Sequence, residues 1–222
     1  MTDAHGRPVG VRALRRRRGG GDIEAIASAP VAVPAGWRRD GDRRCGLVVP
    51  EDAPVGPLRG DNGAPILVAF DGPDRTIVAI DVCTVGWLAV PSPWLVAVGD
   101  AIVHTTLVSG LDVVLFGLAP GELESAGARL HVAADADDLD HLVGQLVGDD
   151  EPTVVVASRA DSAVLRYTHE LGAAVVSDGD EREAGARVTS VGGRWRLDPP
   201  GWPVDAVRPP PGFAQHNART GV

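Results

Sequence analysis

Residues 153–177 read TVVVASRADSAVLRYTHELGAAVVS and decide the predicted fold. The run at 153–157 is apolar and rich in β-branched residues, which is typical of a buried strand. Residues 162–171 have the spacing of a helix that Gly172 ends, and a second apolar strand follows at 173–177. Two apolar strands joined by one helix indicate a parallel pair covered on both faces.

The same alternation extends toward the N-terminus. We therefore predict an α/β domain over residues 64–197, with a mainly parallel sheet and helices on both faces. Its further expected elements are a strand at 76–81, a helix at 91–109, strands at 111–116 and 127–133, a helix at 137–147, and hairpins at 66–70 with 76–80 and at 187–191 with 193–197.

The flanking segments differ from this domain in composition. Residues 1–22 contain an arginine run and a glycine triplet, so we expect a flexible arm. Residues 23–63 alternate short apolar runs with prolines and charges, which indicates irregular structure or short strands. Residues 198–222 are rich in proline and predict an extended tail. Either tail could contact a protein partner or a second copy of the chain.

Composition excludes several function classes. All 21 basic residues are arginines, so a P-loop lysine, a Schiff-base lysine and a lysine general base are excluded. The net charge of -9 argues against a surface built throughout to coat nucleic acid. Cys45 and Cys83 lack the spacing of a zinc site. Apolar runs are too short for a membrane span or a secretory signal, so we expect a cytoplasmic protein without membrane contact.

Acidic residues follow several of the expected strands. Asp81 ends the strand at 76–81, Asp135, Asp137 and Asp138 follow the strand ending at 133, and Asp161 follows the strand at 153–157. Since ligands bind beyond the carboxyl ends of parallel strands, we expect these carboxylates to converge. Such oxygen ligands suit Mg²⁺ or Mn²⁺, which can activate water against a phosphodiester. The structural alternative is that the acids cap helices.

A family resemblance points the same way. Four stretches carry it: VVLFG at 113–117, ADDL at 136–139, VVVAS at 154–158 and LGAAVVS at 171–177. Together they resemble the NYN branch of the PIN-like nucleases. The resemblance implies a metal-dependent ribonuclease that hydrolyses RNA, with Asp81, Asp138 and Asp161 as catalytic residues, and with Asp137 as a further metal ligand. Arg159 would then orient a substrate phosphate.

The chain also departs from the family pattern. The family places an aspartate directly after the serine that ends its fourth strand, whereas Arg159 stands here and Asp161 is the nearest acid. The first-strand motif of the family is Asp-Gly-x-Asn, and Asp71-Gly72 is an alternative to Asp81. An arginine can hold a phosphate without cutting it. A non-catalytic interaction protein or a nucleotide-binding α/β protein is therefore the alternative function.

Overall fold

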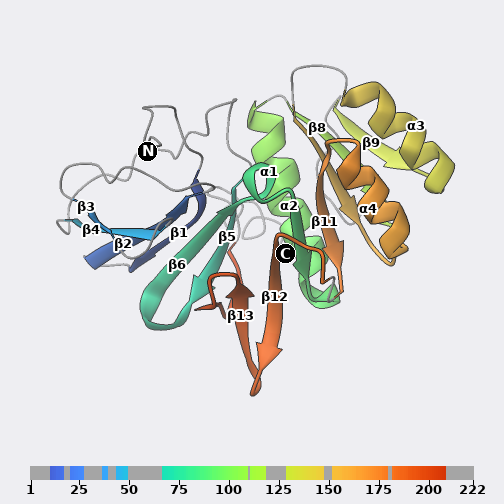
Figure 1. Ribbon diagram of the computed structural model, residues 1–222. Helices are drawn as coiled ribbons and strands as arrows, with labels where there is room; N and C mark the ends of the chain where they lie inside the picture. Colours follow the sequence, from blue (N-terminus) through green and yellow to red (C-terminus); the bar gives the residue numbers. More distant parts are fainter. Residues whose placement is uncertain are drawn as a thin grey trace, which may run out of the picture.

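The computed structural model describes residues 11–17, 21–27, 37–39, 44–49, 67–109, 111–118, 129–147, 152–179 and 182–208. These residues form an α/β protein with a mixed, largely parallel sheet and a separate antiparallel sheet (Figure 1). The α/β class and the largely parallel sheet were both predicted. The separate antiparallel sheet was not, and it accounts for most of the differences described below.

The mixed sheet has the strand order β14-β13-β12-β7-β11-β10-β8-β9. Its strands are β7 (Trp87–Val90), β8 (Asp112–Phe116), β9 (Leu130–Ala133), β10 (Thr153–Ala157), β11 (Ala174–Asp178), β12 (Ala186–Val191), β13 (Arg194–Asp198) and β14 (Trp202–Pro203). Neighbours from β12 to β9 are parallel, and β13 and β14 are added antiparallel. Ala157 is in register with Phe116 and Ser177, so the parallel strands end together at one carboxyl edge.

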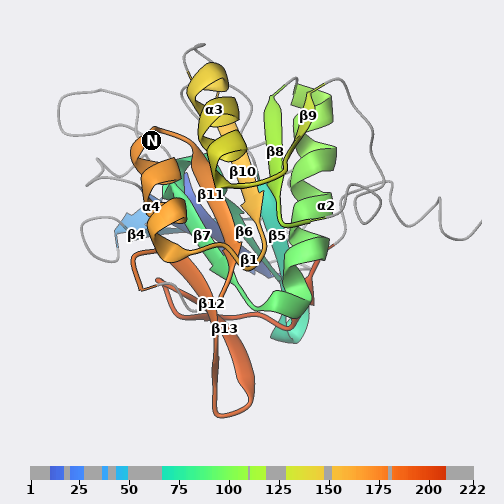
Figure 2. The ribbon, with the colours of Figure 1, turned by 90° about the vertical axis from the view of Figure 1, so that its right-hand side faces the viewer.

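Helices cover the two faces of the mixed sheet. Consecutive residues of β11 show this, because Val176 packs in the core cluster that contains Val98 of α2 (Ser92–Ser109). Val175 packs in the other cluster, with α3 (Ala136–Leu146) and α4 (Ser162–Glu170). Figure 2 shows the helices from a second direction. The predicted helices at 91–109, 137–147 and 162–171 therefore agree with the structure to within one residue at each end.

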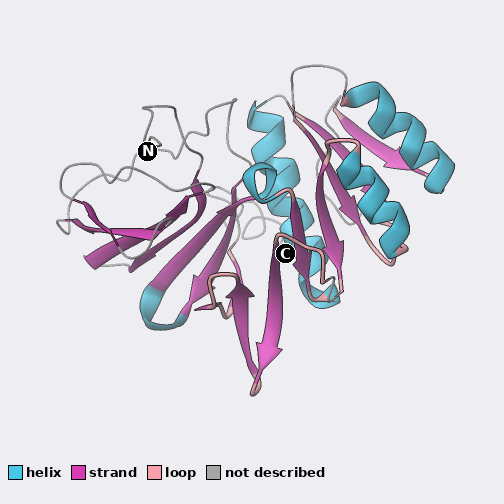
Figure 3. Ribbon diagram, viewed as in Figure 1, coloured by secondary structure: helices cyan, strands magenta, loops and turns pink. Residues whose placement is uncertain are grey.

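The antiparallel sheet has the strand order β15-β5-β6-β1-β2-β4-β3. Figure 3 shows the strands of both sheets in magenta. Its strands are β1 (Val11–Arg17), β2 (Gly21–Ala27), β3 (Trp37–Arg39), β4 (Arg44–Val49), β5 (Leu67–Gly72), β6 (Thr76–Asp81) and β15 (Ala206–Val207). The hairpin of β5 and β6 closes through a 3-10 turn, η1 (Pro73–Arg75), as the sequence predicts.

The prediction that β6 is the first strand of a β-α-β unit is wrong. The sequence placed this strand in the parallel sheet, but it pairs antiparallel with β5 and β1. Val78 and Ile80 are buried while Ile77 and Ala79 are half-buried, which is the alternation of a strand covered mainly on one face. A short helix, α1 (Val82–Val85), turns the chain after β6, and β7 is the true first strand of the unit.

The two flanks also differ from expectation. Residues 11–17 were expected in a flexible arm, yet β1 lies between β2 and β6 with Ala13 and Leu14 buried. Residues 198–208 were expected in an extended tail, yet Trp202 is buried in β14 and β15 pairs with β5. Pairing partners remote in sequence supply these contacts, and local composition does not reveal them. Residues 1–10 and 209–222 lie outside the described residues.

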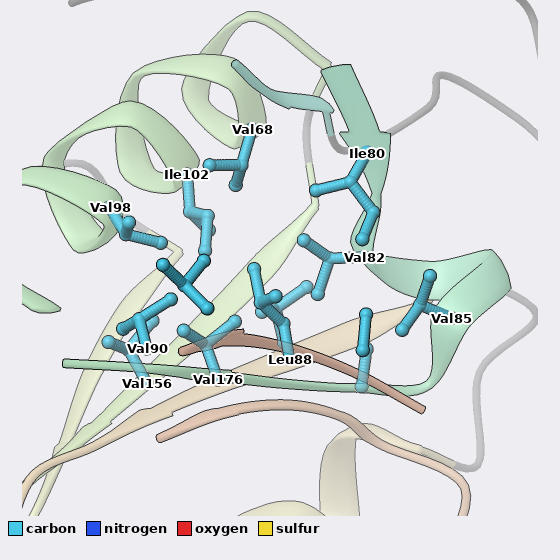
Figure 4. Close-up of a cluster of buried hydrophobic side chains, with 14 of the residues drawn as sticks. Val68, Ile80, Val82, Val85, Leu88, Val90, Val98, Ile102, Val156 and Val176 are labelled. Carbon is cyan, nitrogen blue, oxygen red and sulfur yellow. The ribbon is translucent and has the colours of Figure 1, made fainter. Parts of the chain in front are cut away.

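One hydrophobic core joins the two sheets. Figure 4 shows Ile80 of β6, Val82 of α1 and Leu88 of β7 pointing toward the side chains of α2. Because the antiparallel sheet closes over α2 and this face of the mixed sheet, both sheets depend on the same buried surface. Within the described residues, no helix combines the length and the apolar character that crossing a membrane requires.

Candidate functional site at the carboxyl edge of the mixed sheet

Asp81 lies at the wrong end of the mixed sheet for the predicted metal centre. It is the last residue of β6, and α1 leads from it to the start of β7. Figure 1 shows α1 at the end of the sheet from which the β11 arrow starts. Asp161 follows the other end of β10. Strands of four or five residues separate the two edges by about 13 to 17 Å, so these carboxylates cannot share an ion.

The surroundings of Asp81 show what it does instead. Its side chain caps α1, accepting hydrogen bonds from the backbone N–H of Cys83 at 3.1 Å and from the Thr84 hydroxyl at 2.7 Å. The residue is only 5% exposed. Burial raises the pKa of the Asp81 carboxyl, and the hydrogen bonds from Thr84 and Cys83 oppose that rise. Asp81 is therefore a buried helix cap.

The acids that follow β9 also cap a helix. Asp135 Oδ1 accepts a bond from the backbone N–H of Asp138 at 2.9 Å, and Asp138 Oδ2 accepts one from Ala134 N–H at 2.9 Å. Asp137 is exposed beside them in the first turn of α3. Because β8 separates β9 from β10, this group starts about 10 Å along the edge from the end of β10.

Asp161, the last of the predicted metal ligands, caps α4. Its Oδ1 accepts a bond from Ala163 N–H at 2.7 Å. Among the residues that the structure describes, no group of three or more His, Cys, Asp or Glu side chains is placed to hold a metal ion. Asp81, Asp137, Asp138 and Asp161 do not form such a group, and their catalytic roles stay a prediction. Asp81, Asp138 and Asp161 instead have the helix-capping role that was the structural alternative. Each accepts a backbone hydrogen bond where a helix begins.

The structure instead brings polar groups together around Asp178, which ends β11. Its Oδ1 accepts a hydrogen bond from the backbone N–H of Arg159 at 2.7 Å. Its Oδ2 accepts longer bonds from the hydroxyls of Ser92 at 3.2 Å and Ser158 at 3.3 Å. We call Ser92, Ser158, Arg159 and Asp178 the edge cluster. Its members come from the first turn of α2, the end of β10 and the end of β11.

Arg159 has an unusual backbone in this cluster. Its φ is 55°, in the left-handed region that residues other than glycine rarely adopt. The residue is exposed. Gly117, after β8, packs against the same turn so closely that a Cβ atom there would collide with the Ser158 carbonyl. The turn after β10 is therefore fixed from both sides, by Asp178 on β11 and by Gly117 after β8.

The edge cluster lies where ligands bind in open α/β sheets. After β7 the chain enters α2 on one face of the sheet, and after β10 it enters α4 on the other. β11 ends between these two strands, so its carboxyl end lies between the strands that lead into α2 and α4. In open α/β sheets, ligands bind beyond the carboxyl ends of the strands. Both helices also begin here, with N–H groups oriented toward the edge.

Sequence reasoning identified one member of this cluster and missed the others. Arg159 was predicted to contact a phosphate, and it lies at the edge with an exposed side chain. Asp178 was assigned to a loop because the strand was ended at Ser177. The rule that selects Asp161, an acid just beyond a parallel strand, applies equally to Asp178, which directly follows the predicted strand at 173–177 and is the last residue of β11.

Comparisons with known proteins add no family to this description. No protein-family model matches the chain, and no curated protein matches it significantly. The fold defines an α/β protein with a mixed, largely parallel sheet and an antiparallel sheet. Since a fold of this class serves many chemistries, function has to be argued from the edge cluster itself.

Proposed function

We propose that the protein binds a nucleotide at the carboxyl edge of its mixed sheet, with Arg159 contacting the phosphate. One observation carries the proposal: an exposed arginine is held in a left-handed backbone conformation at the carboxyl edge of the mixed sheet, where Asp178 ends β11. A non-glycine residue in this region costs on the order of 1 to 3 kcal/mol, and such strain is concentrated at functional sites.

The contacts of Arg159 explain how the strain is maintained. The Asp178 carboxylate accepts the Arg159 N–H, so the hydrogen bond fixes the backbone and leaves the guanidinium exposed. Guanidinium groups bind phosphate oxygens through two parallel N–H donors. A side chain whose backbone is fixed in advance loses less conformational freedom on binding. This arrangement suits an arginine that binds an anionic ligand.

The remaining groups favour a nucleotide over a simple phosphate. The two hydroxyl bonds to Asp178 Oδ2, at 3.2 and 3.3 Å, are longer than the 2.7 to 2.8 Å typical of O–H···O contacts. Oδ2 can therefore exchange them for a hydroxyl of the ligand. A ribose attached to the phosphate would supply such a hydroxyl, which would leave the phosphate to Arg159 and the α4 N-terminus.

Binding of mononucleotides to the full chain tests this proposal. Isothermal titration with AMP, ADP and ATP, each with and without Mg²⁺, should give a saturable signal with at least one of them. Arg159→Ala should weaken that binding by tenfold or more, because the charged contact is lost. Arg166→Ala is the matched control, since Arg166 is also exposed but pairs with Glu183. No binding at millimolar nucleotide, or equal binding by Arg159→Ala, would reject the proposal.

A metal-dependent ribonuclease is the second candidate. It is favoured by one observation, that Asp161 follows β10 and Asp178 ends the neighbouring strand β11. Cleavage of a labelled RNA in Mn²⁺ that is lost in Asp161→Asn and Asp178→Asn, but kept in Asp81→Asn, would support it. An inert RNA in the presence of a protein that still binds nucleotide would favour the binding function.

A further inference from the structure

The hairpin of β12 and β13 extends beyond the rest of the mixed sheet. Arg187 of β12 is level with Ala89 of β7, which is one residue before β7 ends. Thr189 to Val191 therefore lie past the carboxyl edge, and Figures 1 and 2 show the hairpin projecting from the body. Gly192 and Gly193, with φ of 59° and 75°, close it in a tight two-residue turn. It is a two-stranded ribbon with a tight turn at its tip.

The two faces of this ribbon differ in chemistry. Val188 and Leu197 are paired across the strands and lie in the core shared with the antiparallel sheet. Side chains alternate along a strand, so the opposite face carries Arg187, Thr189, Val191, Arg194, Arg196 and Asp198. We call this the arginine face. Val191 is 56% exposed and the Arg196 side chain is 41% exposed.

The arginine face is basic in an acidic protein. Residues 186–198 contain three arginines and one aspartate, a local charge of +2, whereas the whole chain carries -9. Asp198 lies at the base of the ribbon, 4.0 Å from Arg196 Nε, while Arg194 lies next to the turn. Arg194 and Arg196 are two residues apart on one strand, so their attachment points are about 6.7 Å apart.

From these features we infer that the arginine face binds double-stranded DNA, with the ribbon entering the major groove. Residues 189–191 extend about 10 Å past the sheet edge, and the B-DNA major groove is about 8.5 Å deep and 12 Å wide. A two-stranded ribbon fits a groove of that width, and the arginines would face the phosphates and base edges. The major groove of A-form RNA is too narrow for side chains to read, which makes DNA the better partner.

Fluorescence anisotropy with the full chain tests this inference. The probes are a labelled 20-base-pair DNA duplex, an RNA duplex of the same sequence and one DNA strand, each at 50 and 200 mM NaCl. We expect the DNA duplex to bind tightest, with affinity falling steeply as salt rises. Arg194→Ala with Arg196→Ala should weaken DNA binding at least tenfold at 50 mM NaCl. It should also lower the slope of log K against log salt by about 2.

Two further variants keep the test decisive. Arg196 donates to the Gly201 carbonyl, so its removal could disturb folding, whereas Arg194→Glu changes only an exposed residue beside the turn. Arg194→Glu should abolish binding and retain the thermal midpoint, and Arg166→Ala should leave binding unchanged. Preference for the RNA duplex or the single strand, or DNA binding that is insensitive to Arg194→Glu, would overturn the inference, as would no binding at 50 mM NaCl.

Discussion

The Asp178 carboxylate at the end of β11 accepts a 2.7 Å hydrogen bond from the backbone N–H of Arg159, which lies beyond the end of β10. A side chain on one strand thereby fixes the backbone of the turn after its neighbour. A charge-assisted bond of this kind is stronger than a bond between neutral groups. The left-handed backbone of Arg159 and the position of its guanidinium therefore depend on Asp178.

This dependence predicts that Asp178 and Arg159 act as one unit. Asp178→Ala leaves the Arg159 N–H without its acceptor, so it should lower the free energy of unfolding by about 1 to 2 kcal/mol. It should also reduce nucleotide affinity almost as much as Arg159→Ala does. Chemical denaturation and titration of both single variants and the double variant measure the coupling. Additive losses in the double variant would contradict the prediction.

Asp178→Asn is the informative control for that experiment. Its amide oxygen can still accept the Arg159 N–H, so the turn should be retained while the negative charge is removed. We expect stability close to that of the unchanged protein. Nucleotide affinity should fall less than in Asp178→Ala, because the Arg159 turn is kept while the acceptor that Oδ2 offers to a ligand hydroxyl is lost.

Gly117 should be intolerant of any side chain. Its φ is 66°, and a Cβ atom would collide with the Ser158 carbonyl in the turn that carries Arg159. Gly117→Ala should therefore lower the free energy of unfolding by more than about 1 kcal/mol. The control is Gly144→Ala in α3, where no atom lies within 4 Å of the added Cβ. That change should stabilise the protein by up to about 1 kcal/mol, as urea denaturation can show.

The elements that the sequence predicted well are those fixed by local pattern. In α3, Leu139 and Val143 are four residues apart and both are buried, as the helical spacing of apolar residues predicts. The helix begins directly after its acidic cap, Asp135. The strand β6 shows the limit. Its apolar residues suit a parallel or an antiparallel strand equally. The antiparallel sheet contains β6 because β6 pairs with β1, which lies some sixty residues earlier in the chain.

The candidate site was predictable only in part for the same reason. An acid beyond a strand can cap the next helix, as Asp161 does, or join a neighbouring turn, as Asp178 does. Which of these happens depends on the strand order, since β11 lies between β7 and β10. Local sequence does not contain that order. Asp81 was misplaced because its strand was assigned to the wrong sheet.

The buried carboxyl of Asp81 should make stability depend on pH. Its pKa in the folded protein is raised above the ordinary 3.8, so the folded state holds this proton more tightly than the unfolded state does. The protonated form therefore favours folding at low pH, and this contribution is lost as pH rises through the folded pKa. Asp81→Asn keeps an oxygen acceptor for the cap and removes the titration. Its stability relative to the unchanged protein should rise between pH 4 and pH 7.

A second substitution separates charge from capping at that position. Asp81→Ala removes the titration as well, and it also removes the acceptor of the Cys83 N–H and the Thr84 hydroxyl, so it should be less stable than Asp81→Asn by about 1 to 2 kcal/mol across this pH range. Urea denaturation at four pH values distinguishes the two variants. A stability difference between Asp81→Asn and the unchanged protein that is independent of pH would rule out the titration of Asp81.

Cys83 should react slowly with thiol reagents in the folded protein. Burial, and after it the neighbouring Asp81 carboxylate, raise the pKa of the Cys83 thiol from 9.0 to about 12. Since the thiolate is the reactive form, that rise in the pKa of the thiol lowers the thiolate fraction roughly a thousandfold at pH 8. Cys45→Ser leaves Cys83 as the sole thiol, and the rate of its reaction with an aromatic disulfide can be compared in buffer and in 6 M guanidinium chloride. Adding Asp81→Asn removes the nearby charge and should raise the rate in buffer, whereas equal rates in buffer and denaturant would show that the thiol is neither buried nor held neutral.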